Sequence, residues 1–318
     1  MNIIKTKSIP SDGWLGFKQN FKSDAASGFV VFLLALPLSL GIAKASDFPP
    51  IMGLITAIVG GILVSFFMGS RLTIKGPAAG LIVILASSVA DFGQGDAVLG
   101  WKLALGALVF AGLIQILFGV LKFGKFIDFF PLSAIHGMLA AIGIIIVAKH
   151  IPILLNNNFS IYKNLTPIEL LLKIPHFIQS LDPKATIIGV FSLFIMMGWQ
   201  RIKFKKLHRI PAPLIVLLLA IPFEYFVVID HENVSKSLVS IGVLKDHINI
   251  YVDFDGIYQI KVFIKYVLMF AIVGTLESLL TVKAIDDLDP YRRKSNVNKD
   301  IIAVGIGNTF VAFLGGLP

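Results

Sequence analysis

Long apolar stretches recur along the whole chain, and they constrain the fold more than any other feature of the sequence. A bilayer core of roughly 30 Å takes about 20 apolar residues per helical crossing. Windows near this length, almost free of charge, lie at 28–43, 51–69, 103–121, 132–148, 185–200, 212–229, 262–282 and 301–317. With a shorter run inside 72–90, they predict about nine membrane segments. We therefore expect an all-α polytopic membrane protein, with residues 1–318 in one transmembrane domain and no room for a separate soluble one.

The distribution of charge decides what the net charge of +9 means. In a soluble protein such an excess would suggest nucleic acid as a partner. If the segments alternate in direction, most Lys and Arg residues fall on the side of the N-terminus, including the cluster 201–209, whereas acidic residues such as Asp91 and Asp96 gather on the other side. This is the positive-inside pattern. It predicts an integral protein of the inner (plasma) membrane with a cytoplasmic N-terminus, in contact with lipid and not with nucleic acid.

Composition excludes several kinds of chemistry. Hydrophobic residues make up 56% of the chain and charged residues 15%, with a mean hydropathy of +0.85, so the excess apolar surface needs lipid. The chain has no cysteine, which excludes disulfides and thiolate chemistry. No zinc-ligand set, phosphate loop or nucleophile triad occurs. We therefore expect no enzyme and no cofactor.

The segment 72–90 departs from the pattern of a full membrane helix. Leu72, Thr73 and Ile74 favour extended backbone and predict a short strand, and Gly76-Pro77 then breaks any helix. A helix that begins at Ala78 and ends near residue 90 covers only about 20 Å, which is too short to cross the bilayer. Such a half-helix begins inside the membrane, where its N–H groups and positive dipole end attract an anion. The alternative is a proline kink in an ordinary tilted helix.

Glu277 is the ionisable side chain that lies deepest in an apolar segment. An ionised carboxylate there costs several kcal/mol unless it is paired or hydrated, so such residues are usually functional. Thr281 follows one helical turn later on the same face. A carboxylate and a hydroxyl suit a hard cation such as Na⁺, or a proton relay. The alternative is a neutral, hydrogen-bonded Glu277 that only packs. Three further polar residues receive structural interpretations. His136 packs, Glu224 snorkels near the end of its segment, and Asn308 caps or bridges helices through its amide.

Several motifs stand in an order that resembles one family of membrane proteins. They are ALPLSLGIAKASDFPPIMGLITAIVGGILVSFFMGS, IKGPAAG, FFPLSAIHGMLAAIG, the ESLLT run at 277–281, RRKSN, GIGN and GGLP. Together they are similar to the sulfate permease (SulP) family of inorganic-anion transporters, over nearly the whole chain. The resemblance implies a fourteen-helix fold of two inverted seven-helix repeats, with half-helices three and ten meeting at the substrate. It also implies a homodimer and, after the membrane domain, a cytoplasmic STAS domain.

The resemblance also implies roles for particular residues. Backbone N–H groups of Ala78, Ala79 and Gly80 bind the anion, with Leu38 also at the substrate site. Glu277 and Thr281 fall on the positions that bind coupling Na⁺ in the bicarbonate-transporting branch. Leu38 and Ile42 replace Gln and Tyr of the sulfate-type branch, which favours the bicarbonate-type branch.

Lys75 replaces a small polar residue of the family, which puts Na⁺ coupling in question. We expect its ammonium group to pair with Glu277; the alternative is that Lys75 extends to the cytoplasmic surface. The chain stops after the ninth helix of this scheme, so the transport domain is expected to be incomplete.

The function expected from these features is secondary active transport of a small inorganic anion of the bicarbonate or sulfate class, coupled to Na⁺ or H⁺. An anion channel or a non-transporting membrane protein on the same scaffold is one alternative. A proton-coupled nucleobase transporter is another, although GPAAG and RRKSN argue against it. The sequence leaves open which anion is carried, whether coupling is to Na⁺, to H⁺ or by exchange, and whether the chain is a natural fragment.

Overall fold

The computed structural model describes residues 9–11, 13–125, 131–155, 157, 162, 165–199, 201, 211–227 and 244–318. These residues form helices and loops, and no β-strand occurs among them. The longer helices are α1 (Gly13–Ala45), α2 (Pro50–Val59), α4 (Ile82–Gly93), α5 (Ala97–Val120), α6 (Leu132–Leu154), α10 (Pro183–Trp199), α11 (Ala212–Val227), α13 (Ile260–Leu288) and α14 (Val297–Phe313). Shorter elements are a π-helix (Gly60–Val64), α3 (Ser65–Phe67), η2 (Ala79–Leu81), α8 (Pro167–Leu172), α9 (Ile174–Gln179), η5 (Leu244–His247) and η6 (Asp255–Tyr258). The all-α class is confirmed.

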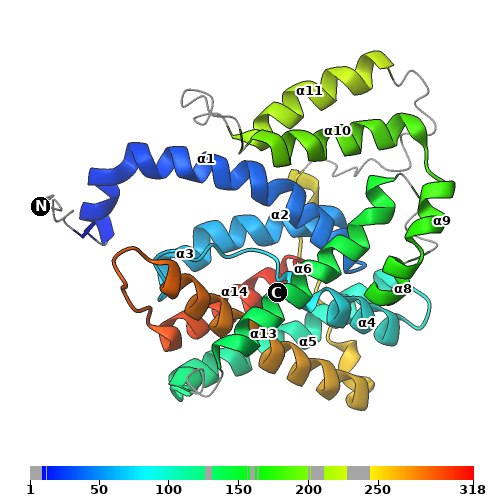
Figure 1. Ribbon diagram of the computed structural model, residues 1–318. Coiled ribbons are helices and arrows are strands. Elements are labelled where there is room, and N and C mark those ends of the chain that lie inside the picture. Colours follow the sequence, from blue (N-terminus) through cyan, green and yellow to red (C-terminus); the bar gives the residue numbers. More distant parts are fainter. Residues whose placement is uncertain are drawn as a thin grey trace, which may run out of the picture.

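Helix α5 forms the centre of the core and packs against α14, α4 and α13 (Figure 1). It approaches α14 closely because glycines face each other: a Cβ on Gly112 would lie 2.8 Å from the carbonyl oxygen of Gly305. Asn308 of α14 donates a buried hydrogen bond of 2.8 Å to the side-chain oxygen of Gln115 in α5. Asn308 therefore bridges two helices through its amide, as the sequence predicts.

Helix α1 is longer than the apolar window 28–43 that predicts it. Its 33 residues span about 50 Å, more than the bilayer core of roughly 30 Å. The polar, aromatic-containing stretch before Gly28 is thus continuous with the membrane span instead of forming a separate helix. Trp14 and Phe21 on this stretch are 70% and 53% exposed, as expected for side chains that lie at a membrane interface.

Four of the described helical stretches are long and apolar enough to cross a membrane: α1, Pro50–Phe67, α5 and α13. Shorter apolar helices lie at Ala79–Gly93, Ala140–Leu154, Thr186–Trp199 and Ala212–Phe223. Large apolar side chains such as Phe194 (69% exposed) and Leu218 (62% exposed) point outward from α10 and α11, which pack against each other (Figure 1). An outer surface of this kind suits lipid and not water.

Helices α8 and α9 are not predicted by the apolar windows. Thr166 and Glu169 form a capping box that starts α8. Buried Leu170 and Phe177 then pack both short helices against Ala148 of α6. Of the remaining sequence predictions, residues 200, 228 and 229, the side chain of Glu224 and all of the basic cluster 201–209 except Arg201 lie outside the described part of the chain. His136 is exposed on α6.

Candidate functional site

The predicted half-helix is present. Residues 73–78 lie outside any helix, with Ala78 in an extended conformation; η2 then begins at Ala79 and α4 ends at Gly93, so this helix is about 22 Å long. Gly76-Pro77 explains the break, since proline lacks an N–H and restricts the residue before it. The extended part is not a strand, which corrects the expectation for residues 72–74. A strand needs a row of backbone partners, and none of residues 72–74 is part of a strand. Further along, the Ala78 N–H donates a hydrogen bond of 2.8 Å to the carbonyl oxygen of Pro318.

The backbone N–H groups at this break are the predicted anion ligands, and two of the three donate to protein acceptors. Ala78 donates to Pro318, as above, and Gly80 donates to Oε1 of Glu277 at 2.9 Å. Ala78 and Ala79 themselves pack, partly buried, against the main core. The amino end of this half-helix is thus already in contact with the carboxyl group of Glu277.

Glu277 reaches the half-helix from α13. Its Oε1 accepts the Gly80 N–H, and its Oε2 is buried and has no hydrogen-bond partner among the described residues. The approach requires glycine, because a Cβ on Gly80 would lie 2.8 Å from the carboxyl carbon of Glu277. Thr281 is half-buried one turn further along α13. A buried carboxylate oxygen without a partner is unusual and marks a place where a cation or a proton would be stabilised.

Lys75 is paired with Asp300 and not with Glu277, which corrects the sequence prediction. The Lys75 ammonium lies 2.6 Å from Oδ2 of Asp300 and donates to the Ser278 hydroxyl at 3.1 Å. The Lys75 side chain is only 14% exposed, so most of it is covered by protein. Asp300 stands in the first turn of α14, just before an apolar run, and its proximity to Lys75 depends on how α14 packs.

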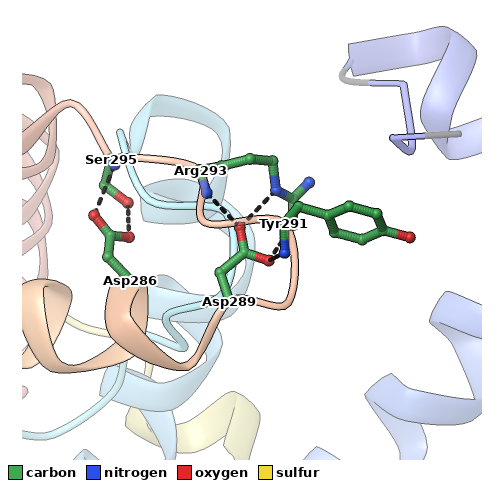
Figure 2. A network of polar contacts seen from close by, with 5 residues as sticks. All are labelled: Asp286, Asp289, Tyr291, Arg293 and Ser295. Atoms are coloured by element: carbon green, nitrogen blue, oxygen red, sulfur yellow. Dashed lines mark hydrogen bonds and ion pairs between the residues drawn. The ribbon is translucent and has the colours of Figure 1, made fainter. Parts of the chain in front are cut away.

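The loop between α13 and α14 contains a network of polar contacts that fixes the start of α14 (Figure 2). Asp289 accepts hydrogen bonds from the backbone N–H and side chain of Arg293, the latter at 2.8 Å from Nε. Asp286 accepts from the N–H and hydroxyl of Ser295. Asn296 then caps α14 by accepting the Lys299 N–H. The RRKSN motif thereby positions Asp300 beside Lys75.

Arg293 holds the pKa of Asp289 at about 2, below its usual 3.8, through hydrogen bonds to the carboxylate. A carboxylate with a depressed pKa stabilises the fold above its unfolded pKa, and that contribution is lost as the pH falls through the folded pKa. We expect Arg293→Gln to lower the melting temperature by a constant amount above about pH 5. The difference from the wild type should shrink as the pH falls from about 4 to about 2. Melting curves at several pH values check this, and a difference independent of pH would contradict it.

Two further residues singled out in the sequence, Leu38 and Ile42, differ in exposure. Leu38 is 48% exposed on α1, whereas Ile42 is buried in the core at 1% exposure. Asp300 and Ser278 were missed as site residues. Ser278 follows Glu277 directly, and Asp300 is an acidic residue that is only 1% exposed at the start of an apolar helix. An acidic residue directly before the apolar run 301–317 is the sequence signal that could have identified Asp300.

Comparison with known proteins gives consistent matches. The model of the protein family described as the sulfate permease family matches residues 21–318. Bicarbonate transporter BicA of Picosynechococcus sp. is 27% identical over 309 residues, which cover 94% of this chain and 51% of BicA. Sulfate transporter 2.1 of Arabidopsis thaliana is 27% identical over 315 residues, which cover 96% of this chain and 46% of that transporter. The chain therefore spans about half the length of the curated relatives that it matches.

The fold is shared with a solved structure, the transmembrane domain of a cyanobacterium bicarbonate transporter BicA. The TM-score is 0.74 at 23% identity, covering 94% of this chain and 73% of the other. Because the family is one of transporters, the expectation that the chain is not an enzyme is confirmed. The apolar helices and the match over nearly the whole chain identify an integral membrane protein. The chain belongs to the sulfate permease family.

Proposed function

We propose that the full-length protein is a secondary active transporter of a small inorganic oxyanion of the bicarbonate or sulfate class. The observation that carries this proposal is the Glu277 carboxylate against the amino end of the half-helix, 2.9 Å from the Gly80 N–H. Membership of the sulfate permease family supports the transport of anions. Relatives named as bicarbonate and sulfate transporters support the class of substrate.

The geometry suggests how anion and cation binding are coupled. The amino end of a helix attracts negative charge through free N–H groups and the helix dipole. In this structure Glu277 accepts one of those N–H groups, so an ionised Glu277 repels and competes with an incoming anion. Na⁺ or a proton on the buried carboxylate removes that negative charge, and the N–H of Gly80 can then turn to the substrate. Binding of the cation and of the anion would favour each other.

Uptake by the full-length protein in proteoliposomes tests this function. We expect saturable uptake of bicarbonate or sulfate over chloride, stimulated by an inward Na⁺ or proton gradient. Glu277→Gln should lose the stimulation and lower gradient-driven uptake by on the order of tenfold or more, because the neutral amide no longer needs a cation. A conductance that rises linearly with anion concentration and ignores both gradients would contradict transport and indicate a channel.

We further propose an inner (plasma) membrane location, a cytoplasmic N-terminus and a homodimer in the full-length form. The excess of Lys and Arg on one side supports the orientation. Because the chain has no native cysteine, single cysteines can report it cleanly. Asp96→Cys should react with an impermeant maleimide outside intact cells and Arg201→Cys should not. The reverse labelling would overturn the orientation, and a monomeric mass in detergent and in nanodiscs would overturn the dimer.

A further inference from the structure

The Lys75 ammonium occupies a small site lined with oxygen atoms. Its nitrogen lies 2.6 Å from Asp300 Oδ2 and 3.1 Å from the Ser278 hydroxyl. That hydroxyl in turn lies 3.2 Å from Asp300 Oδ2, so the three groups contact one another. The second oxygen of Asp300, Oδ1, is buried, and no residue in the described part of the chain forms a hydrogen bond with it. The side chains come from three separate elements: the extended segment before α4, α13 and α14.

The site is largely buried. Asp300 is 1% exposed and the Lys75 side chain 14%. A Cβ on Gly60 would lie 2.7 Å from the carbonyl carbon of Lys75, so the extended segment runs directly against the π-helix. The loop that leads into α14 is held by the hydrogen bonds between Asp289 and Arg293 (Figure 2). Removing the ammonium would leave a carboxylate buried without a counter-charge, which is strongly unfavourable.

A carboxylate oxygen and a hydroxyl oxygen are also ligands that bind Na⁺, a hard cation. Ser278 is the neighbour of Glu277, so the site lies beside the carboxylate to which we assign coupling. We propose that Lys75 is a tethered cation in a monovalent-cation site formed by Asp300 and Ser278, and that this site takes free Na⁺ when the ammonium is removed. The tethered ammonium fills the site in this conformation, so the position needs no cation from solution.

The inference rests on the proposed function only for its uptake readout, because cation binding is measured separately. Two substitutions of Lys75 remove the same charge and differ in the volume that they leave. Lys75→Ser leaves space beside Asp300 for an ion, whereas Lys75→Met fills that space with an uncharged chain of similar length. Both variants lose the ion pair, so a response to Na⁺ that only Lys75→Ser shows cannot come from the lost pair itself.

The experiment compares melting temperatures of the full-length wild type and both variants in NaCl and in N-methyl-D-glucamine chloride of equal ionic strength. We expect Na⁺ to raise the melting temperature of Lys75→Ser by about 2–4 °C and to leave Lys75→Met unchanged. Asp300→Asn in the Lys75→Ser background should abolish the shift. In proteoliposomes, replacing Na⁺ on both sides should lower uptake by Lys75→Ser on the order of tenfold more than it lowers uptake by the wild type.

Three outcomes would overturn the inference. One is the same Na⁺ response in Lys75→Ser and Lys75→Met; the second is a response that survives Asp300→Asn. The third is no response in Lys75→Ser while Lys75→Arg behaves as wild type, which would leave an ion pair with a structural role only. If Lys75→Ser does not fold, Lys75→Ala with added methylammonium replaces it, and failure of methylammonium to restore folding counts against the inference. Failure of the proposed function would appear differently, as absent anion uptake by the wild type.

Discussion

Gly80→Ala is expected to lower the initial rate of anion uptake by the full-length protein by on the order of 100-fold. Its Cβ would lie 2.8 Å from the carboxyl carbon and 2.8 Å from Oε2 of Glu277, a separation that non-bonded atoms do not tolerate. Either Glu277 or the start of the half-helix must then shift by several tenths of an ångström or more. Such a shift breaks the 2.9 Å hydrogen bond and misplaces both the Gly80 amide and the Glu277 carboxylate.

The matched control for this change is Gly61→Ala in the neighbouring π-helix. An added Cβ there meets no atom within 4 Å, so the same substitution should leave uptake unchanged. Equal amounts of folded protein in both variants, measured by fluorescence-detected gel filtration, separate a lost site from lost expression. Uptake by Gly80→Ala within threefold of the wild type would show that the contact between Gly80 and Glu277 does not matter for transport.

Gly112→Leu is expected to destabilise the protein by about 3 kcal/mol and to prevent recovery of folded protein at 37 °C. Gly112 faces α14 at the closest approach of the two helices, where its Cβ would lie 2.8 Å from the Gly305 carbonyl oxygen and 2.8 Å from the Thr309 nitrogen. These neighbours are backbone atoms that cannot rotate away. The two helices must separate, which also breaks the buried hydrogen bond between Asn308 and Gln115.

Gly137→Leu on α6 provides the comparison, because Gly137 is exposed and has open space around its Cα. This variant should melt within about 2 °C of the wild type. Thermal melting in detergent, followed by gel filtration of the soluble fraction, distinguishes the two substitutions. If Gly112→Leu melted at the same temperature as Gly137→Leu, the close contact between α5 and α14 would not be essential to the core.

The apolar windows predict most of the helices because lipid enforces one simple requirement. Every backbone polar group in the bilayer must be satisfied within the segment, so a long apolar run has little choice but to be a helix. The break at Gly76-Pro77 is equally local, since it follows from the chemistry of proline and glycine. The half-helix starting at Ala79 could therefore be predicted to within one residue. The extra length of α1 before Gly28 could not be predicted from the apolar windows, because that stretch contains polar residues and lies outside all of them.

The pairing of charges could not be derived from the sequence. Glu277 is conspicuous as a carboxylate among apolar residues, which makes it the obvious partner for Lys75. In the folded chain Glu277 turns instead to the Gly80 N–H, and Asp300 takes the ammonium at 2.6 Å. Gly80 and Glu277 are 197 positions apart in the chain, and Lys75 and Asp300 are 225 positions apart. Only the packing of α13 and α14 around the extended segment determines which carboxylate meets which donor.

The ion pair between Lys75 and Asp300 has an electrical consequence. Two opposite charges that move together displace no net charge through the membrane voltage, whatever motion the surrounding helices make. A single uncompensated charge that crosses the full field experiences about 2.3 kcal/mol per 100 mV. With the pair intact, Lys75 and Asp300 together add nothing to the voltage sensitivity of transport. With the ammonium removed and no ion in its place, Asp300 adds a negative charge of its own, and the membrane potential then acts directly on the position of α14.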